Sequence, residues 1–317
     1  AFLDVINFTE KVNSTMHAKS HWTLILEAWK LRNFNELVQK LGLISLESKS
    51  WSDAHEKSLE LIDALGDTHQ VEEKRSQVEV AQSVIDDQKR VIEGKPLLNS
   101  NPIKFGIPLL DSKFRPLDVA TGDFSNILFG VTGTGKSSLA NQIAGYNIYE
   151  GKRVAMFLGE SNHESLLTSM AAQRVEVNSD SKLLPGASPE DHEKYLNCLG
   201  ELRDMHEKNF HVYDDDFFIE DIIARCKILK KEMGQIDLVI IDHLHCLKTR
   251  KKFGAKEDRQ KYNYMSAELK PLGMILNCPT LTLAQPSRDF KKSNRPPVES
   301  DLKESGNLED DADRIWG

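Results

Sequence analysis

A glycine-rich segment at residues 130–138 constrains this 317-residue chain more than any other stretch. Its sequence, GVTGTGKSS, fits the phosphate-loop pattern G-x-x-x-x-G-K-[ST]. The apolar residues 127–129 before it suit a buried strand, and residues 139–144 after it suit a helix. Glycines let backbone N–H groups turn towards phosphate oxygens, and the helix N-terminus adds positive charge. The segment therefore predicts a nucleotide-binding site.

The loop predicts two cofactors, ATP and Mg²⁺. Lys136 is expected to reach the β- and γ-phosphates, and the Ser137 hydroxyl to ligate Mg²⁺. The other residues assigned to the nucleotide are Gly130, Thr132, Gly133, Thr134, Gly135 and Ser138. A glycine-rich turn with a chance lysine is the alternative interpretation. Every fixed position of the pattern is filled, which favours the phosphate loop.

The chain from residue 101 alternates between short apolar runs and helical segments. Strands are predicted at residues 127–129, 154–158, 210–213, 238–241 and 280–284. Helices are predicted around residues 163–176, 189–206, 218–234 and 257–276. This order predicts an α/β domain whose mostly parallel sheet has helices on both faces. Pro271 is expected to kink or split the last helix.

The first hundred residues have a different, helical pattern without a catalytic motif. We predict a small all-helical region at residues 1–70, then a helix and linker at 71–100, before a nucleotide-binding domain at 101–317. The helix at about 71–93 carries only a narrow apolar stripe, so it must dock on another surface. Its periodicity leaves two alternatives equally open: docking on its own domain, or on a neighbouring subunit.

Polar residues follow three of the predicted strands. Asp242 closes one strand, and a carboxylate beside a phosphate loop is suited to holding hydrated Mg²⁺. Glu160 follows another, where a carboxylate can accept a proton from attacking water or simply cap the next helix. Gln285 follows a third, where it is either a sensor of the γ-phosphate or an ordinary surface glutamine.

Two basic, glycine-containing loops follow strand ends on the same predicted edge of the sheet. One begins with Arg250, Lys251 and Lys252, and the other runs through residues 288–306. Basic runs are usually solvated loops, but here they stand out from a net charge of −8. This contrast favours contact with a nucleic-acid backbone.

Other features limit the compartment. The chain has no apolar run of about 18–20 residues, and its first residues lack the basic-then-apolar order of a signal peptide. Its four cysteines form no C-x-x-C pair, which is typical of reduced thiols. We therefore expect a cytoplasmic protein with no membrane partner.

The C-terminal part resembles the DnaB-type replicative DNA helicases, a family of RecA-like hexameric motors. The resemblance rests on LAQPSR at 283–288, RPP at 295–297 and SDLKESGNLEDDAD at 300–313. The family reads Ser-Gln-Leu-x-Arg, Arg-Pro and Ser-Asp-Leu-Arg-Glu-Ser-Gly-x-Ile-Glu-x-Asp-Ala-Asp at these places. Weaker matches, including FLGES at 157–161 and IIDHL at 240–244, extend the similarity to about residues 75–317.

The resemblance implies a role for each matched residue. Glu160 would be the catalytic base, Asp242 the Mg²⁺ carboxylate and Gln285 the γ-phosphate sensor, with Lys136 completing the catalytic set. Lys303, Glu304 and Gly306 would lie on a loop that holds single-stranded DNA. The helix at about 71–93 would dock on the adjacent subunit of a homo-hexamer. A primase and a helicase loader are further partners that the family implies, with a bacterial, plasmid or phage origin.

The expected function is therefore ATP-dependent unwinding of duplex DNA by a ring that translocates on one strand. The chain departs from the family at Lys303, where arginine is usual, and it ends before the strands that carry a trans-acting arginine finger. We therefore expect the sequence to be incomplete at its C-terminus. The alternative is a RecA-like assembly or regulatory ATPase that binds nucleotide without unwinding DNA.

Overall fold

The computed structural model describes residues 31–32, 34–50, 53–54, 57–58, 61, 77–177, 187–206, 208–215, 217–253, 258–286 and 308–317. The chain forms two units, Ala1–Val84 and Ile85–Gly317. In the first unit, residues 34–47 are helical. The predicted boundaries at residues 70 and 100 stay predictions.

Helix α4 (Gln77–Ile92) lies within the predicted 71–93 helix and has no buried residue. Its C-terminal end is held by the chain that follows it. Arg90 Nε donates to the carbonyl oxygen of Pro96 at 2.6 Å, and the Asp87 carboxylate accepts from the backbone N–H of Leu98 at 2.8 Å. The helix exposes apolar side chains along its length: Val78, Val80, Val84, Ile85, Val91 and Ile92. The docking of this helix on its own domain or on a neighbouring subunit stays a prediction.

The second unit is built on a six-stranded sheet with the order β3-β2-β4-β5-β1-β6. The strands are β1 (Ser125–Phe129), β2 (Val154–Leu158), β3 (Phe210–Tyr213), β4 (Leu238–Asp242), β5 (Thr280–Ala284) and β6 (Arg314–Trp316). All five neighbouring pairs are parallel. The continuous apolar runs of β2 and β4 are buried along their whole length, as expected for parallel strands covered on both faces.

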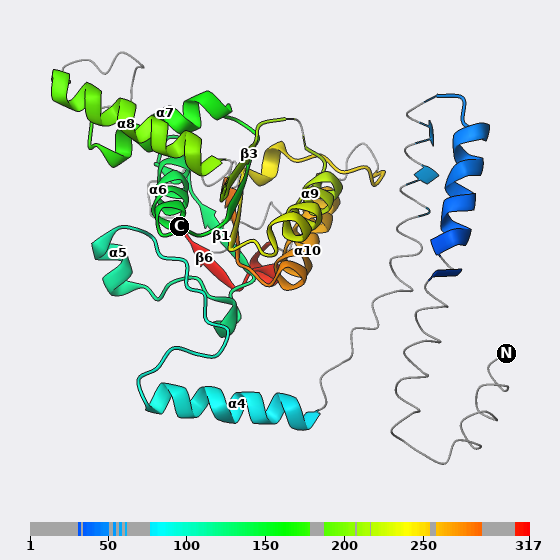
Figure 1. Cartoon of the computed structure of the whole chain (residues 1–317), viewed down its shortest axis with the longest axis horizontal. Helices are drawn as coiled ribbons and strands as arrows, with labels where there is room; N and C mark the ends of the chain where they lie inside the picture. Colours follow the sequence, from blue (N-terminus) through cyan, green and yellow to red (C-terminus); the bar gives the residue numbers. More distant parts are fainter. Residues whose placement is uncertain are drawn as a thin grey trace. The chain divides into compact units, whose positions relative to one another are not determined.

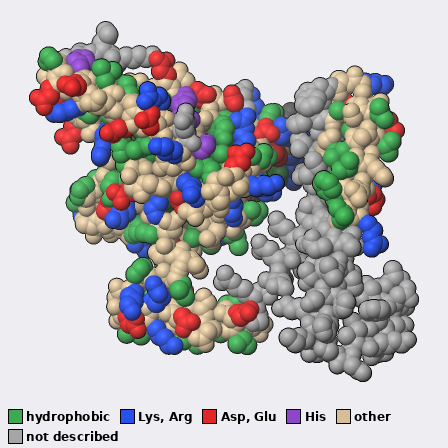
Figure 2. Space-filling view, viewed as in Figure 1, with side chains coloured by type: hydrophobic (Ala, Val, Ile, Leu, Met, Phe, Trp, Pro, Cys, Tyr) green, Lys and Arg blue, Asp and Glu red, His purple; other side chains and the backbone are tan. Residues whose placement is uncertain are grey.

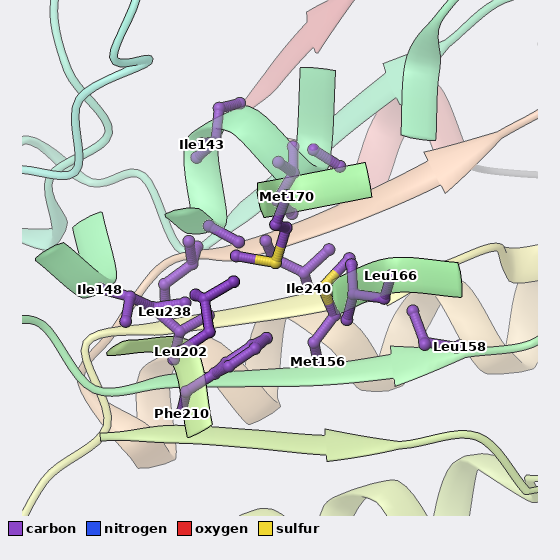
Figure 3. Close-up of a cluster of buried hydrophobic side chains, with 14 of the residues drawn as sticks. Ile143, Ile148, Met156, Leu158, Leu166, Met170, Leu202, Phe210, Leu238 and Ile240 are labelled. Carbon is purple, nitrogen blue, oxygen red and sulfur yellow. The ribbon is translucent and has the colours of Figure 1, made fainter. Parts of the chain in front are cut away.

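Helices cover both faces of this sheet (Figure 1). One face carries α6 (Lys136–Tyr149), α7 (His163–Arg174) and α8 (Pro189–His206); the other carries α9 (Ile219–Met233) and α10 (Asp258–Leu276). Figure 3 shows how Met170 and Leu202 from the first set meet Met156 and Ile240 from the strands. The shorter elements are α5 (Pro108–Lys113), η1 (Val119–Thr121), η2 (Leu244–Cys246) and α11 (Leu308–Asp311).

The predicted α/β class is confirmed, and the predicted strands and helices match the observed ones closely. Of the two outcomes predicted for Pro271, the split is wrong, because α10 continues from Asp258 to Leu276, and the kink stays a prediction. A proline inside a helix costs about 3 kcal/mol. Burial of Leu269, Leu272 and Leu276 offsets this, at about 1.5–3 kcal/mol for each side chain.

Strand β6 was not predicted, and tertiary contacts hold it at the sheet edge. The Asp313 carboxylate accepts hydrogen bonds from the backbone N–H groups of Phe124 and Ser125, both at 2.9 Å, and pairs with Lys270. The next residue, Arg314, pairs at 2.7 Å with Asp123, whose side chain is 1% exposed. These contacts fix the last residues of the chain against the start of β1.

The described surface mixes charges of both signs. Figure 2 shows Lys, Arg, Asp and Glu side chains interspersed on the face in view, without a large patch of one sign. Among the described residues, no helix is both long enough and apolar enough to span a membrane.

A close approach at Gly273 supplies a test of this packing. A Cβ at this position would lie 2.4 Å from the carbonyl oxygen of Phe124. We therefore expect Gly273→Ala to lower the free energy of unfolding by about 1–3 kcal/mol in urea denaturation. The matched control is Gly200→Ala in α8, where a Cβ meets no atom within 4 Å. That substitution should raise the free energy by about 0.5–1 kcal/mol, and equal effects of the two would contradict the packing.

Candidate functional site

The predicted site residues meet at one edge of the sheet. Because β1, β2, β4 and β5 are parallel, their carboxyl ends lie at the same edge, where ligands bind in such sheets. The phosphate-loop segment follows β1, Glu160 follows β2, Asp242 ends β4 and Gln285 follows β5. Strand β5 lies between β1 and β4, so Gln285 is positioned between the loop and Asp242.

The glycine-rich loop has the backbone that its sequence predicts. Gly133 and Gly135 have φ values of 84° and 90°, a region in which a side chain would be strained. At Gly130, a Cβ would lie 2.9 Å from Thr134 Oγ1. Lys136 begins α6, and its ammonium donates to the carbonyl oxygens of Gly130 at 2.7 Å and Val131 at 3.0 Å. The Lys136 side chain therefore lies across the phosphate loop.

The remaining loop residues assigned to the nucleotide, Thr132, Ser137 and Ser138, are all exposed. The Ser137 side chain lies beside Asp242, a residue that is only 4% exposed. Burial raises the pKa of Asp242 above its ordinary value, while the nearby Ser137 hydroxyl and Lys136 oppose the rise. Two hard oxygen ligands, a hydroxyl and a carboxylate, thus meet beside the loop, which fits Mg²⁺ chemistry.

Glu160 lies at the end of β2 with its side chain 53% exposed. Its alternative role, capping the following helix, belongs to another residue. Asn162 is the N-cap of α7, and its side chain accepts from the backbone N–H of Ser165 at 2.8 Å. The Glu160 carboxylate instead faces His243, at 3.7 Å between Oε1 and Nδ1.

His243 is the site residue that sequence reasoning missed. It follows Asp242 at the end of β4 and is 4% exposed. Its Nε2 lies 3.2 Å from the Gln285 side-chain nitrogen, and its Nδ1 lies 3.5 Å from Cys246 Sγ. Burial lowers the pKa of His243 and so favours the neutral ring. The negative charges of Glu160 and Asp242 oppose this shift. The available signal was the run Asp-His at a strand end, but only the fold shows which side chains it joins.

The contacts of His243 depend on a close approach between two chain segments. Gly159 donates its backbone N–H to the carbonyl oxygen of Asp242 at 2.5 Å. A Cβ on Gly159 would lie 2.5 Å from the Cβ of Cys246, which ends η2. Glycine at 159 therefore allows η2 to pack against the end of β2 and brings Cys246 and His243 beside Glu160.

The predicted DNA-binding residues fall into two groups. Lys303, Glu304 and Gly306 lie outside the described residues. Arg250 pairs with Asp221 at 2.8 Å and lies 4.8 Å from the ring centre of Phe218. Lys251 lies 4.6 Å from the ring centre of Tyr264, and both Lys251 and Lys252 are exposed. All three basic residues of this loop are exposed, and Arg250 differs in being paired with a carboxylate.

Comparisons with known proteins find relatives among the replicative DNA helicases. Replicative DNA helicase DnaB of Geobacillus stearothermophilus is 30% identical over 221 residues, which cover 66% of this chain and 46% of the relative. The DnaB of Rickettsia felis is 26% identical over 317 residues, covering 88% of this chain and 60% of the relative. The chain thus spans about half the length of the first of these relatives.

Two solved structures have the same fold. One, described as an ATPase domain, matches 76% of this chain and 83% of its own, with a TM-score of 0.63 and 21% identity. A DnaB-like replicative helicase, described with its interactions with primase, matches 99% of this chain and 71% of its own, with a TM-score of 0.66 and 20% identity. Together with the six-stranded parallel sheet, these matches confirm the RecA-like fold class. The model of the DnaB-like helicase C-terminal domain matches residues 109–316, and the chain belongs to that family.

Proposed function

We propose that this chain is the motor part of an ATP-dependent replicative DNA helicase, acting as a hexameric ring on single-stranded DNA. The observation that carries the proposal is the meeting of a phosphate loop with Glu160, Asp242 and Gln285 at one sheet edge. Family membership supports the same activity. The relatives are bacterial replicative helicases, which supports a cytoplasmic location.

The nucleotide would bind with its phosphates in the loop at residues 130–138. Lys136 is half-buried, and its ammonium already donates to two carbonyl oxygens of the loop, so it is within reach of phosphate oxygens bound there. Asp242 and Ser137 would hold Mg²⁺, which supplies positive charge that neutralises the developing phosphate charge when bound. The position of the Ser137 hydroxyl beside the Asp242 carboxylate supports this assignment.

Glu160 would accept a proton from the water that attacks the γ-phosphate. Its half-exposed carboxylate can contact water, and the lowered pKa of the neighbouring His243 favours a neutral ring beside it. Gln285 would respond to loss of the γ-phosphate. The amide of Gln285 contacts His243, and the His243 ring contacts Glu160. A displacement of Gln285 or of Glu160 would therefore alter the contacts of the other through the His243 ring.

Hydrolysis would be coupled to DNA through the loops after β4 and β5. Lys303, Glu304 and Gly306 are the proposed contacts of one loop, and Lys251 and Lys252 those of the other. The exposed apolar side chains of α4 support docking on a neighbouring subunit. A primase is a proposed partner, since one structural neighbour is described with its primase interactions, and a helicase loader is a further one.

A forked-duplex assay tests the function as a whole. We expect the wild-type chain to separate the strands when ATP is present. Lys136→Ala should not separate them, because Lys136 is the only basic residue in the sequence of the phosphate loop, residues 130–138. Lys113→Ala, in the exposed helix α5, is the matched control and should unwind normally. Nucleotide-dependent assembly without strand separation would favour the alternative, a RecA-like regulatory ATPase.

The proposed role of Glu160 predicts that a substitution there lowers ATP turnover without changing nucleotide affinity. Glu160→Gln keeps the size and hydrogen-bonding capacity of the side chain but cannot accept the proton. ATP turnover should fall by about 10²–10⁴-fold while nucleotide affinity stays within about twofold. Glu193→Gln, at an exposed position of α8, should leave both quantities unchanged. Normal turnover in Glu160→Gln would assign the base elsewhere.

The proposed DNA loop predicts a change in DNA binding without a change in nucleotide binding. Lys303→Ala should weaken single-stranded DNA binding. The slope of the logarithm of affinity against the logarithm of salt concentration should fall by the amount of roughly one phosphate contact. Nucleotide affinity should stay unchanged, because the phosphate loop is a separate segment. An unaltered salt titration of DNA affinity would contradict the loop assignment.

A further inference from the structure

Three side chains at the sheet edge have the donor atoms and spacing of a transition-metal site. Glu160 supplies a carboxylate oxygen, His243 a ring nitrogen and Cys246 a thiol sulfur, and the three atoms lie within 4.8 Å of one another. They come from two segments that the close approach at Gly159 holds together. The cluster adjoins the Asp242 and Ser137 pair assigned to Mg²⁺ but shares no residue with it.

Two of the three donor separations are close to the edges of a tetrahedron around zinc. With metal–ligand distances of about 2.0–2.3 Å, tetrahedral angles place neighbouring N, O and S ligands about 3.4–3.6 Å apart. His243 Nδ1 lies 3.5 Å from Cys246 Sγ and 3.7 Å from the Glu160 carboxylate. Small rotations of the half-exposed Glu160 side chain are therefore enough to complete three-ligand coordination.

The ligand types select against Mg²⁺. Mg²⁺ prefers oxygen ligands in a near-octahedral arrangement, whereas thiolate and imidazole ligands favour Zn²⁺ and similar cations. Binding would require loss of the Cys246 thiol proton to solvent and a ring tautomer with the proton on Nε2. The amide nitrogen of Gln285 lies 3.2 Å from Nε2. With the amide turned by 180°, its oxygen would accept from that proton, as outer-shell partners of metal-bound histidines do.

We propose that Glu160, His243 and Cys246 form an inhibitory site for a thiophilic divalent cation such as Zn²⁺. The site has three protein ligands, with solvent on the exposed side of Glu160 as the fourth. A cation bound there holds the carboxylate that would accept the proton from water, so ATP turnover stops while Mg²⁺ and nucleotide remain bound. The inhibitory half of this proposal rests on the proposed role of Glu160, and the binding half does not.

Cobalt binding tests the site without any reference to activity. Co²⁺ added to the full chain in excess Mg²⁺ should give a thiolate-to-cobalt charge-transfer band that saturates at one equivalent and is lost on addition of Zn²⁺. Cys246→Ser should abolish the band, and Cys198→Ser, which alters a buried cysteine in α8, should retain it. A band that survives Cys246→Ser, or none in the wild-type chain, overturns the proposal.

Glu160→Gln provides a second variant at an exposed position, where folding is not at risk. Its Zn²⁺ affinity, measured by competition with a chromophoric chelator, should fall by at least about tenfold. Unchanged affinity would remove Glu160 from the site and overturn the proposal.

Inhibition is tested by measuring ATP turnover with and without Zn²⁺. The rate of each variant with Zn²⁺ is compared with the rate of the same variant without Zn²⁺. Turnover of the wild-type and Cys198→Ser chains should fall by at least about tenfold at saturating Zn²⁺, and that of Cys246→Ser by less than about twofold. Zinc bound at the cluster without loss of turnover overturns the inhibitory role. No turnover even without zinc would contradict the proposed function instead, and the cobalt band would still decide the metal site.

Discussion

The site depends on the parallel pairing of β1, β2, β4 and β5, which aligns four strand ends at one edge. Each strand is short and buried along its whole length, so its register is set by apolar packing on both faces. A slip of one residue in β4 would turn Asp242 to the opposite face of the sheet. The same burial that stabilises the domain thus sets the position of its polar residues, and the loops need only carry the chain from one strand end to the next.

A second constraint, the approach of η2 to Gly159, determines how the polar residues interact. The hydrogen bond from Gly159 N–H to Asp242 O extends the β2–β4 pairing by one step, and the absent side chain leaves room for Cys246. His243 is thereby buried between residues that follow β2 and β5. A buried imidazole is costly to protonate, and the lowered pKa of His243 follows from this.

The strand ends could be predicted from sequence because apolar runs and glycine-rich turns are local signals. Strands at 154–158, 210–213 and 280–284 match the structure to the residue, and with them the places of Glu160 and Gln285. Strand β6 could not be predicted, since its three residues have no periodic pattern and their position depends on the distant contacts of Asp313. His243 was missed for the same reason: its partners lie on segments far apart in the sequence.

The contacts of Asp313 also change how the C-terminal signature is interpreted. That stretch carries the resemblance to replicative helicases, and its first half holds the predicted DNA-binding residues. Its second half is structural: Leu308 is fully buried, Asp311 accepts from Ser266 at 2.7 Å, and Asp313 holds the start of β1. Since β1 leads directly into the phosphate loop, the second half of this signature supports the strand that precedes the predicted nucleotide site.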